Sequence, residues 1–415
     1  MKKILAMALT AILAFNIMGC GNSASSTSPS RTNMAEANVG ESKTEEGAAK
    51  TSATDASTAK IEEASAQSDT KETTPEQTAK ATKTIVDHDG VEMEIPTEIN
   101  RIVVAAWQLP APLAVYLGSA EKIVGVAPAS MIAAQNSIFS DVYPEILNAS
   151  TKFYEGGTIN IEELLKLNPD IVIGTSGETA ESIRAVGIPA VSFSVSQWDY
   201  DVIQTNEAWI KLFDDIFGGS ELSSQVSEYS KQVQASIAEK VSGLTEEEKK
   251  KVMFLFTYSD ATMTTSSKGF FGQSWCDLTG CINVGAEIEA LGSASINMEQ
   301  VYEWDPEVII ITNFTSAQPE DLYNNTIGSD DWSTVNAVKN KRVYKMPMGW
   351  YRSYTPGVDT AVTLQWVAKM VYPELFDDVD IHQAAKDYFQ NYYRITLTED
   401  QINNMFNPPR EASAY

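Results

Sequence analysis

Residues 158–173 read TINIEELLKLNPDIVI, and residues 295–310 read SINMEQVYEWDPEVII. The two stretches match position by position in the pairs Asn160 and Asn297, Glu162 and Glu299, Pro169 and Pro306, and Asp170 and Glu307. In each copy we expect the asparagine to cap a short helix, the glutamate to suit the positive end of the helix dipole, and the proline to end the helix. An unbroken run of β-branched residues follows, which is typical of a strand buried on both faces of a parallel sheet. The repeat therefore predicts two similar α/β lobes.

The rest of the chain extends this architecture. Short apolar strands alternate with helices over residues 84–200 and again over residues 250–395, which predicts a doubly wound α/β lobe in each range. Between them, residues 201–245 are helix-forming almost throughout, broken only at Gly218-Gly219, with apolar positions at spacings of three and four. We expect a long rigid helical spacer there and a ligand cleft between the lobes. Residues 396–415 are predicted as a C-terminal tail.

The N-terminal region indicates export and anchoring. Lys2 and Lys3 precede an apolar stretch that is too short for an ordinary membrane span, and residues 1–20 end in Gly19-Cys20. This pattern resembles a bacterial lipoprotein signal peptide, so we expect Cys20 to carry a lipid; an ordinary signal peptide with an incidental cysteine is the alternative. Residues 21–83 are rich in Ser, Thr, Ala and Glu and predict a disordered tether. We therefore expect a monomer held by lipid at the extracytoplasmic face of the cell membrane.

Composition and motifs exclude several functions. The formal net charge of −26 argues against nucleic-acid binding, which needs a basic surface. The chain has no G-x-S-x-G, H-E-x-x-H, Walker or G-x-G-x-x-G pattern and only two histidines, which predicts that it is not an enzyme. It offers too few histidines and cysteines for a metal site. Cys276 and Cys281 suit either a disulfide or two buried thiols beside a helix end at Gly280.

The signal peptide, the tether, the paired N-x-E…P-[DE] units, the helical spacer and a closing W-Y-R segment together resemble the bacterial solute-binding proteins of ABC importers for iron-siderophores, haem and corrinoids. The resemblance covers roughly residues 84–393. It implies that one acidic residue on each lobe docks onto arginines of the importer permease. The matching residues here are Glu162 and Glu299.

The candidate ligand contacts follow predicted strands, because ligands of parallel sheets bind beyond the carboxyl ends of the strands. These residues are Trp107, Tyr154, Tyr258, Trp350, Tyr351 and Arg352. Aromatic faces suit a large, partly apolar chelate, and Arg352 suits carboxylate, catecholate or phosphate groups. For each aromatic residue, core packing is the alternative.

The predicted ligand is an iron or cobalt chelate, with no intrinsic cofactor. A ferric siderophore is the first choice, a corrinoid or haem the second, and a molybdate-type oxyanion a weaker one. A tethered surface protein without a transport role is the alternative of a different class.

Overall fold

The computed structural model describes residues 81–219 and 221–413. The signal peptide, lipidation at Cys20 and nearly all of the predicted tether lie outside the described residues. An antiparallel hairpin opens the described chain, with strands β1 (Thr82–Val86) and β2 (Glu92–Pro96). The hairpin begins two residues before the predicted boundary of the first lobe.

The first lobe is built on a four-stranded parallel sheet in the order β4-β3-β7-β8. Its strands are β3 (Ile102–Val104), β4 (Ile123–Val126), β7 (Ile171–Ile173) and β8 (Ala190–Val191). Its helices are α1 (Pro110–Leu117), α2 (Pro128–Gln135), α3 (Ile138–Val142), α4 (Ile161–Lys166) and α5 (Gly177–Ala185). A small hairpin of β5 (Tyr154–Glu155) and β6 (Thr158–Ile159) leads into α4. All residues of β3 and β7 are buried, as the β-branched runs predict.

The second lobe contains a mixed sheet in the order β12-β10-β9-β13-β14, with β11 also paired to β9. Its strands are β9 (Lys251–Tyr258), β10 (Met263–Ser266), β11 (Ile282–Asn283), β12 (Ser293–Ser295), β13 (Val308–Ile311) and β14 (Val343–Lys345). Its helices are α8 (Phe271–Thr279), α9 (Met298–Trp304), α10 (Pro319–Asn324), α11 (Asn336–Lys339), α12 (Thr360–Val371) and α13 (Ile381–Tyr388). The strand after each repeat, β7 or β13, lies inside its sheet, so the α/β architecture with two lobes is confirmed.

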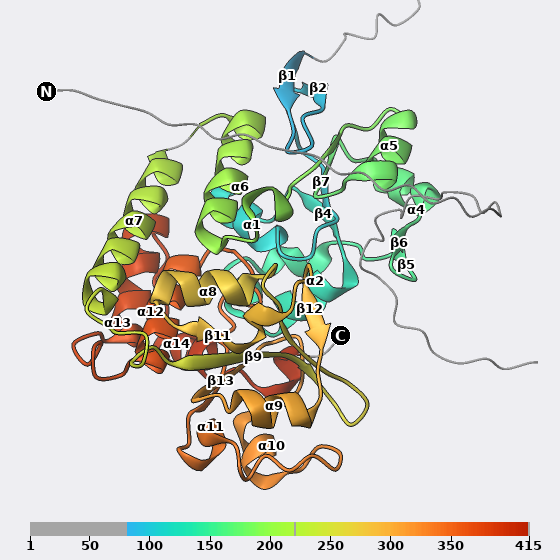
Figure 1. The fold of residues 1–415 in the computed structure, drawn as a ribbon. Helices are drawn as coiled ribbons and strands as arrows, with labels where there is room; N and C mark the ends of the chain where they lie inside the picture. The colour runs from blue at the N-terminus through green and yellow to red at the C-terminus, as the bar shows by residue number, and fades with distance from the viewer. Residues whose placement is uncertain (1–80, 220, 414–415) are drawn as a thin grey trace, which may run out of the picture. The chain divides into compact units, whose positions relative to one another are not determined.

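Two helices, α6 (Val202–Phe217) and α7 (Glu221–Val241), form the link between the lobes (Figure 1). The α6 helix packs against α1 of the first lobe and against α12, whereas α7 packs against α8 and α12 of the second lobe. The spacer is therefore helical, as predicted, but it bends at Gly218, whose φ of 95° is unfavourable for other residues.

The segment predicted as a C-terminal tail is folded. Helix α14 (Glu399–Phe406) lies within it, followed by a 3₁₀ turn at Arg410–Ser413. Ile402 and Met405 are fully buried, and the Met405 carbonyl accepts a hydrogen bond of 2.8 Å from the Met348 amide. This packing makes α14 part of the second lobe rather than a loose end.

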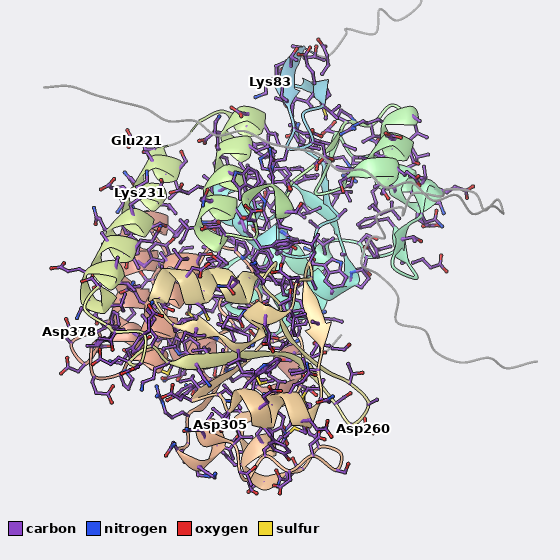
Figure 2. All side chains as sticks on the ribbon, in the orientation of Figure 1. Lys83, Glu221, Lys231, Asp260, Asp305 and Asp378 are labelled. Carbon is purple, nitrogen blue, oxygen red and sulfur yellow. The ribbon has the colours of Figure 1, made fainter. Side chains whose placement is uncertain are left out.

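Both copies of the repeat use the same local interactions. The Asn160 side chain caps α4 by accepting a hydrogen bond from the Glu163 amide, and Asn297 caps α9 through the Gln300 amide. Asn168 and Asp305, which precede the two prolines, both adopt left-handed φ angles, 45° and 42°; Asp305 is labelled in Figure 2. Asparagine and aspartate tolerate this conformation better than most residues.

The acidic residue after each proline anchors a neighbouring strand. The Asp170 carboxylate accepts hydrogen bonds from the amides of Asn100 and Arg101 at 2.9 and 3.0 Å, just before β3. The Glu307 carboxylate accepts from the Lys251 amide at 3.1 Å, at the start of β9. The repeat thus aligns the amino ends of two adjacent buried strands in each lobe.

This anchoring predicts a loss of stability on truncation. Asp170→Ala leaves two backbone amides without their acceptor, so we expect the free energy of unfolding to fall by about 1–3 kcal/mol. Urea unfolding followed by circular dichroism measures this change. Glu162→Ala, in the same repeat but at an exposed position, is the matched control and should change the free energy by less than about 0.5 kcal/mol. Equal effects of the two substitutions would contradict the anchoring role.

Candidate functional site

Arg352 lies in the loop that follows β14, at the carboxyl end of the second lobe's sheet. Its side chain is 0% exposed, although arginine is rarely buried. The guanidinium carbon lies 4.8 Å from the centre of the Phe314 ring and 5.6 Å from that of Tyr351. A planar cation over an aromatic face is held by the ring quadrupole. The site therefore contains a buried guanidinium held against aromatic rings.

Aromatic rings pack beneath this charge. Phe314, which follows β13, stacks on Phe256 of β9 with ring centres 4.9 Å apart. Phe270 and Tyr354 complete the group, at 5.2 and 5.5 Å from Phe256. We call Arg352, Phe314, Phe256, Phe270 and Tyr354 the Arg352 cluster. Its rings contact one another mainly edge to face, and the guanidinium lies against Phe314.

A buried carboxyl group, that of Asp359, anchors the Arg352 loop through Ser353. The Ser353 hydroxyl donates to Asp359 Oδ2 at 2.5 Å, and the Gly349 amide donates to Ser353 Oγ at 3.4 Å. A Cβ on Gly349 would lie 2.5 Å from the same carboxylate oxygen, so only glycine fits there. Burial raises the pKa of Asp359 from 3.8 to about 6, although the hydrogen bond from Ser353 opposes this shift.

The same loop contacts the first lobe. The Ile138 amide of α3 donates to the Gly349 carbonyl at 3.1 Å, and the Trp350 ring lies 6.2 Å from that of Phe139. A cavity of 310 Å³ lies beside this contact, lined by residues of α2, α3 and α14 and by Met348. Met348 forms an antiparallel bridge with Arg352. The Arg352 loop therefore lies where the two lobes meet.

The structure brings together three of the six predicted ligand contacts. Trp350 and Tyr351 belong to one large buried core, and the Arg352 guanidinium lies 5.6 Å from the Tyr351 ring. Trp107 packs against the same extended core on the side of the first lobe, where its carbonyl accepts a hydrogen bond from the Ser130 hydroxyl. Tyr154 does not join them, because it packs against a separate core of the first lobe, where its ring meets Phe153.

Tyr258 does not join them either. Its hydroxyl accepts a hydrogen bond from Trp332 Nε1 at 2.9 Å and donates to Asp330 at 3.1 Å, within the other core of the second lobe. A register shift between β9 and β10 leaves Phe256 as an extra residue, which is a β-bulge. The bulge turns Tyr258 to the opposite face of the sheet from Phe256. Tyr258 therefore lies in the core on the other face of the sheet, and Phe256 lies in the Arg352 cluster instead.

Two further buried polar groups follow the repeated strands. Thr175 comes after β7, and Asn313 comes after β13. Within the described residues, neither Thr175 Oγ1 nor Asn313 Oδ1 has a hydrogen-bond partner. Buried polar atoms of this kind are costly unless a ligand or water satisfies them. They are candidate contacts from opposite lobes.

The other predicted residues are not members of the Arg352 cluster. Glu162 and Glu299 are exposed in the first turns of α4 and α9. Cys276 and Cys281 are buried free thiols, and Gly280 ends α8 in a left-handed conformation. Of the two alternatives for these cysteines, the structure therefore has two buried thiols beside a helix end rather than a disulfide. No helix in the described part of the chain is long and apolar enough to cross a membrane.

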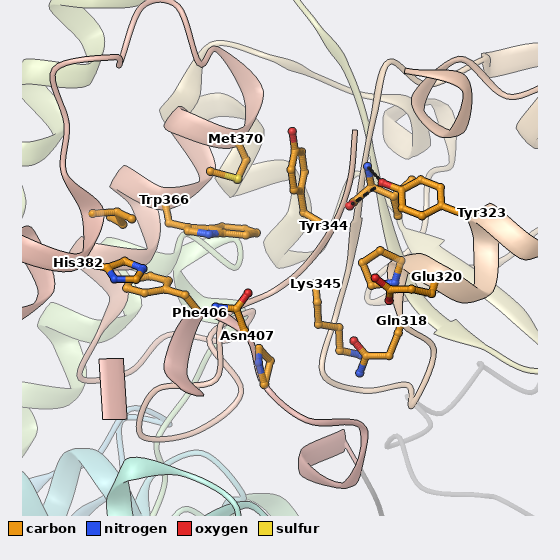
Figure 3. A pocket seen from close by; sticks show the side chains of 14 residues that line it. Gln318, Glu320, Tyr323, Tyr344, Lys345, Trp366, Met370, His382, Phe406 and Asn407 are labelled. Carbon is orange, nitrogen blue, oxygen red and sulfur yellow. Dashed lines mark hydrogen bonds between the residues drawn. The ribbon is translucent and has the colours of Figure 1, made fainter. Parts of the chain in front are cut away.

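A groove of 570 Å³ opens on the flank of the second lobe, along the edge strand β14 (Figure 3). Trp366, His382 and Phe406 line one side of it, and Tyr323 lines the other. All of its lining residues come from residues 318–408, so it is not the space between the lobes.

The buried carboxyl group predicts a pH-dependent stability. Because the pKa of Asp359 is higher in the folded chain than in the unfolded chain, the folded state is favoured at low pH and loses this advantage as pH rises from about 4 to about 6. At 1.36 kcal/mol per pH unit the loss is about 3 kcal/mol. We expect the stability of Asp359→Asn relative to wild type to rise by about this amount between pH 4 and pH 7 in urea unfolding.

The exposed Asp260, labelled in Figure 2, provides the control, and Asp260→Asn should show no such trend. A difference between wild type and Asp359→Asn that stays constant with pH would contradict the assigned role of Asp359.

Known proteins share this architecture. The chain is 27% identical over 345 residues to the molybdate-binding protein MolA of Haemophilus influenzae, covering 78% of this chain and 94% of that protein. The structure of MolA bound to molybdate superposes with a TM-score of 0.64 at 24% identity, covering 76% of this chain and 99% of MolA. A periplasmic solute-binding protein from Veillonella parvula gives a TM-score of 0.70 at 30% identity, with 79% and 97% of the two chains covered. Helicobacter pylori CeuE, solved with Ni(II) bound, gives 0.63 at 22% identity, with 78% and 99% covered.

The periplasmic binding protein family model matches residues 103–348, which include the repeat, both linking helices and the strands of both lobes up to β14. The match, the two-lobe fold and the relatives agree with the predicted resemblance, and they identify a transport protein without enzymatic activity. The chain belongs to the periplasmic binding protein family and is a substrate-binding protein of an ABC importer.

Proposed function

We propose that this protein captures a small tetrahedral oxyanion of the molybdate class and delivers it to the permease of its importer. The observation that carries the proposal is the fully buried guanidinium of Arg352 on the face of Phe314, at the junction of the lobes. An anion bound beside a charge in a water-poor site interacts with it far more strongly than in water.

The packing of the aromatic rings supports a small ligand. A siderophore or a macrocycle needs exposed ring faces on which its organic body can be buried. Here Phe256, Phe270 and Tyr354 pack on one another through edge-to-face and tilted contacts, and Phe314 stacks on Phe256 and lies against the guanidinium. Phe270, Phe314 and Tyr354 are buried. This arrangement leaves little aromatic surface for a large chelate.

Polar groups at the strand ends support an oxyanion in particular. The Thr175 hydroxyl of the first lobe can donate to an anion, and it has no other partner among the described residues. The Trp350 indole N–H is likewise buried without an acceptor in that part of the chain. An oxyanion offers several acceptor oxygens and would satisfy such donors together.

One relative also supports an oxyanion ligand. MolA, which is 27% identical to this chain, is a molybdate-binding protein. The ferric siderophore favoured by the sequence, and the corrinoid and haem alternatives, are the competing ligands. The shared family does not separate them, so ligand binding must be measured.

The decisive experiment is a titration of the full chain with molybdate, followed by tryptophan fluorescence and calorimetry. We expect saturable binding by molybdate, and a loss of at least about 30-fold in affinity in Arg352→Gln, because removing one partner of a buried charge pair costs about 2 kcal/mol or more. A ferric catecholate siderophore, haem and cobalamin are titrated in parallel.

Arg342→Gln is the matched control. The Arg342 guanidinium donates to the carbonyls of Met370 and Val371 in the same lobe, away from the Arg352 loop. It should bind molybdate within about twofold of wild type. Saturable binding of one chelate with no response to molybdate would overturn the oxyanion proposal in favour of a chelate receptor.

Docking onto the permease is proposed for Glu162 and Glu299, one on each lobe. Their exposure in the first turns of α4 and α9 leaves both carboxylates accessible to basic residues of a partner. We also propose that the protein acts as a monomer anchored through a lipid on Cys20.

A charge reversal separates docking from ligand binding. In the double variant Glu162→Lys, Glu299→Lys, like charges would face the permease, so molybdate uptake by cells should fall at least about tenfold while the purified protein binds molybdate as wild type does. Glu181→Lys with Glu228→Lys, on exposed positions of α5 and α7, carries the same charge change and should transport normally. Equal uptake by the two double variants would argue against these docking residues.

A further inference from the structure

Lys345 is a buried cation that the proposed ligand contacts do not include. It is the last residue of β14, and its side chain is only 7% exposed. Its Nζ donates to the backbone carbonyls of Thr312, Thr315 and Ala317 at 2.8, 2.6 and 2.9 Å. All three N–H groups of the ammonium are thereby used. Figure 3 shows the side chain extending from β14 towards Gln318.

These three bonds shape the segment that supports the Arg352 guanidinium. The segment from Thr312 to Ala317 curls around Nζ and carries Phe314, whose ring lies beneath Arg352. The Phe314 amide is fixed as well, because it donates to the Thr312 hydroxyl at 3.1 Å. Lys345 is therefore a structural support for the floor of the anion site.

The charges around Lys345 are mostly positive. Burial, together with the positive charges of Arg410 and Arg352, lowers its pKa from 10.5 to about 7, and the negative charge of Asp321 opposes this shift. The Asp321 carboxylate is itself paired with Arg410 at 2.8 Å. On the groove side the titratable neighbours are Glu320, Tyr323, Tyr344 and His382. Arg352 and Lys345 thus form two neighbouring buried cations.

We propose that Lys345 is a specificity-determining residue that positions Phe314 beneath Arg352 and, as a second buried positive charge, selects doubly charged over singly charged oxyanions. The inference rests on the proposed function. Two cations near one ligand stabilise a dianion twice as much as a monoanion of the same shape, because Coulomb energy scales with the ligand charge. A role in loop structure alone would affect both anions equally.

Molybdate and perrhenate test this difference, since both are tetrahedral oxyanions and only the first is a dianion. The variant is Lys345→Gln, whose amide keeps N–H donors for the carbonyls but removes the charge. We expect calorimetry on the full chain at pH 6.5 to show molybdate affinity reduced about tenfold and perrhenate affinity only about threefold. Wild type should prefer molybdate, and this preference should fall about threefold in the variant.

Lys369→Gln is the matched control, because Lys369 Nζ donates to the carbonyls of Phe376 and Val379 in the same lobe. Its affinities for both anions should stay within about twofold of wild type. Far-ultraviolet circular dichroism and thermal melting of all variants establish that they are folded. Should Lys345→Gln not fold, the same molybdate-to-perrhenate ratio is measured on wild type from pH 6 to 9.

The pH series is also a second test. Deprotonation of Lys345 should weaken molybdate binding as pH rises above about 7, and more than it weakens perrhenate binding. Equal losses for the two anions, in the variant or with pH, would overturn the inference and leave the proposed function intact. A wild-type protein that binds neither anion would overturn the proposed function, and the inference with it.

Discussion

A strand buried on both faces has room for polar chemistry only at its ends, and this constraint shapes both lobes. The residues of β3, β7 and β13 are all buried, so every polar function of these strands lies before or after them. At the amino ends, Asp170 and Glu307 anchor neighbouring strands through backbone amides. At the carboxyl ends, Thr175 follows β7, Asn313 follows β13 and the Arg352 loop follows β14. Stability is thus served by one end of these strands, and the proposed ligand contacts lie at the other.

The sequence predicted what depends on local signals. Asn160, Pro169 and the β-branched run after them specify a capped helix, its end and a buried strand within sixteen residues, so both copies of the repeat fold as expected. The C-terminal helix α14 carried a comparable signal in the spacing of Ile402 and Met405, but its short amphipathic pattern is weak beside the polar residues around it.

The site was predicted less completely, because its members depend on tertiary contacts. Tyr258 follows a strand, as a ligand contact should, yet a bulge at Phe256 turns it to the other face of the sheet. Lys345 has no signal in the sequence, since a lysine at the end of an edge strand normally reaches water. Its burial depends on three carbonyls that come together only when the segment after β13 curls around it. Arg352 was found because it stands between aromatic residues.

Because the chain is strongly acidic, an anion site in this protein must attract its ligand through short-range interactions. With a formal net charge of −26, the long-range field of the protein repels an approaching dianion and slows its association, most strongly at low ionic strength. Tight binding must then come from slow dissociation, which depends on short-range interactions inside the site. Buried cations meet this requirement, because their field is little screened where the ligand is bound, whereas surface lysines would be screened by salt. Under the proposed function, Arg352 on Phe314 together with the buried Lys345 would let a protein that repels anions at long range hold one by short-range attraction.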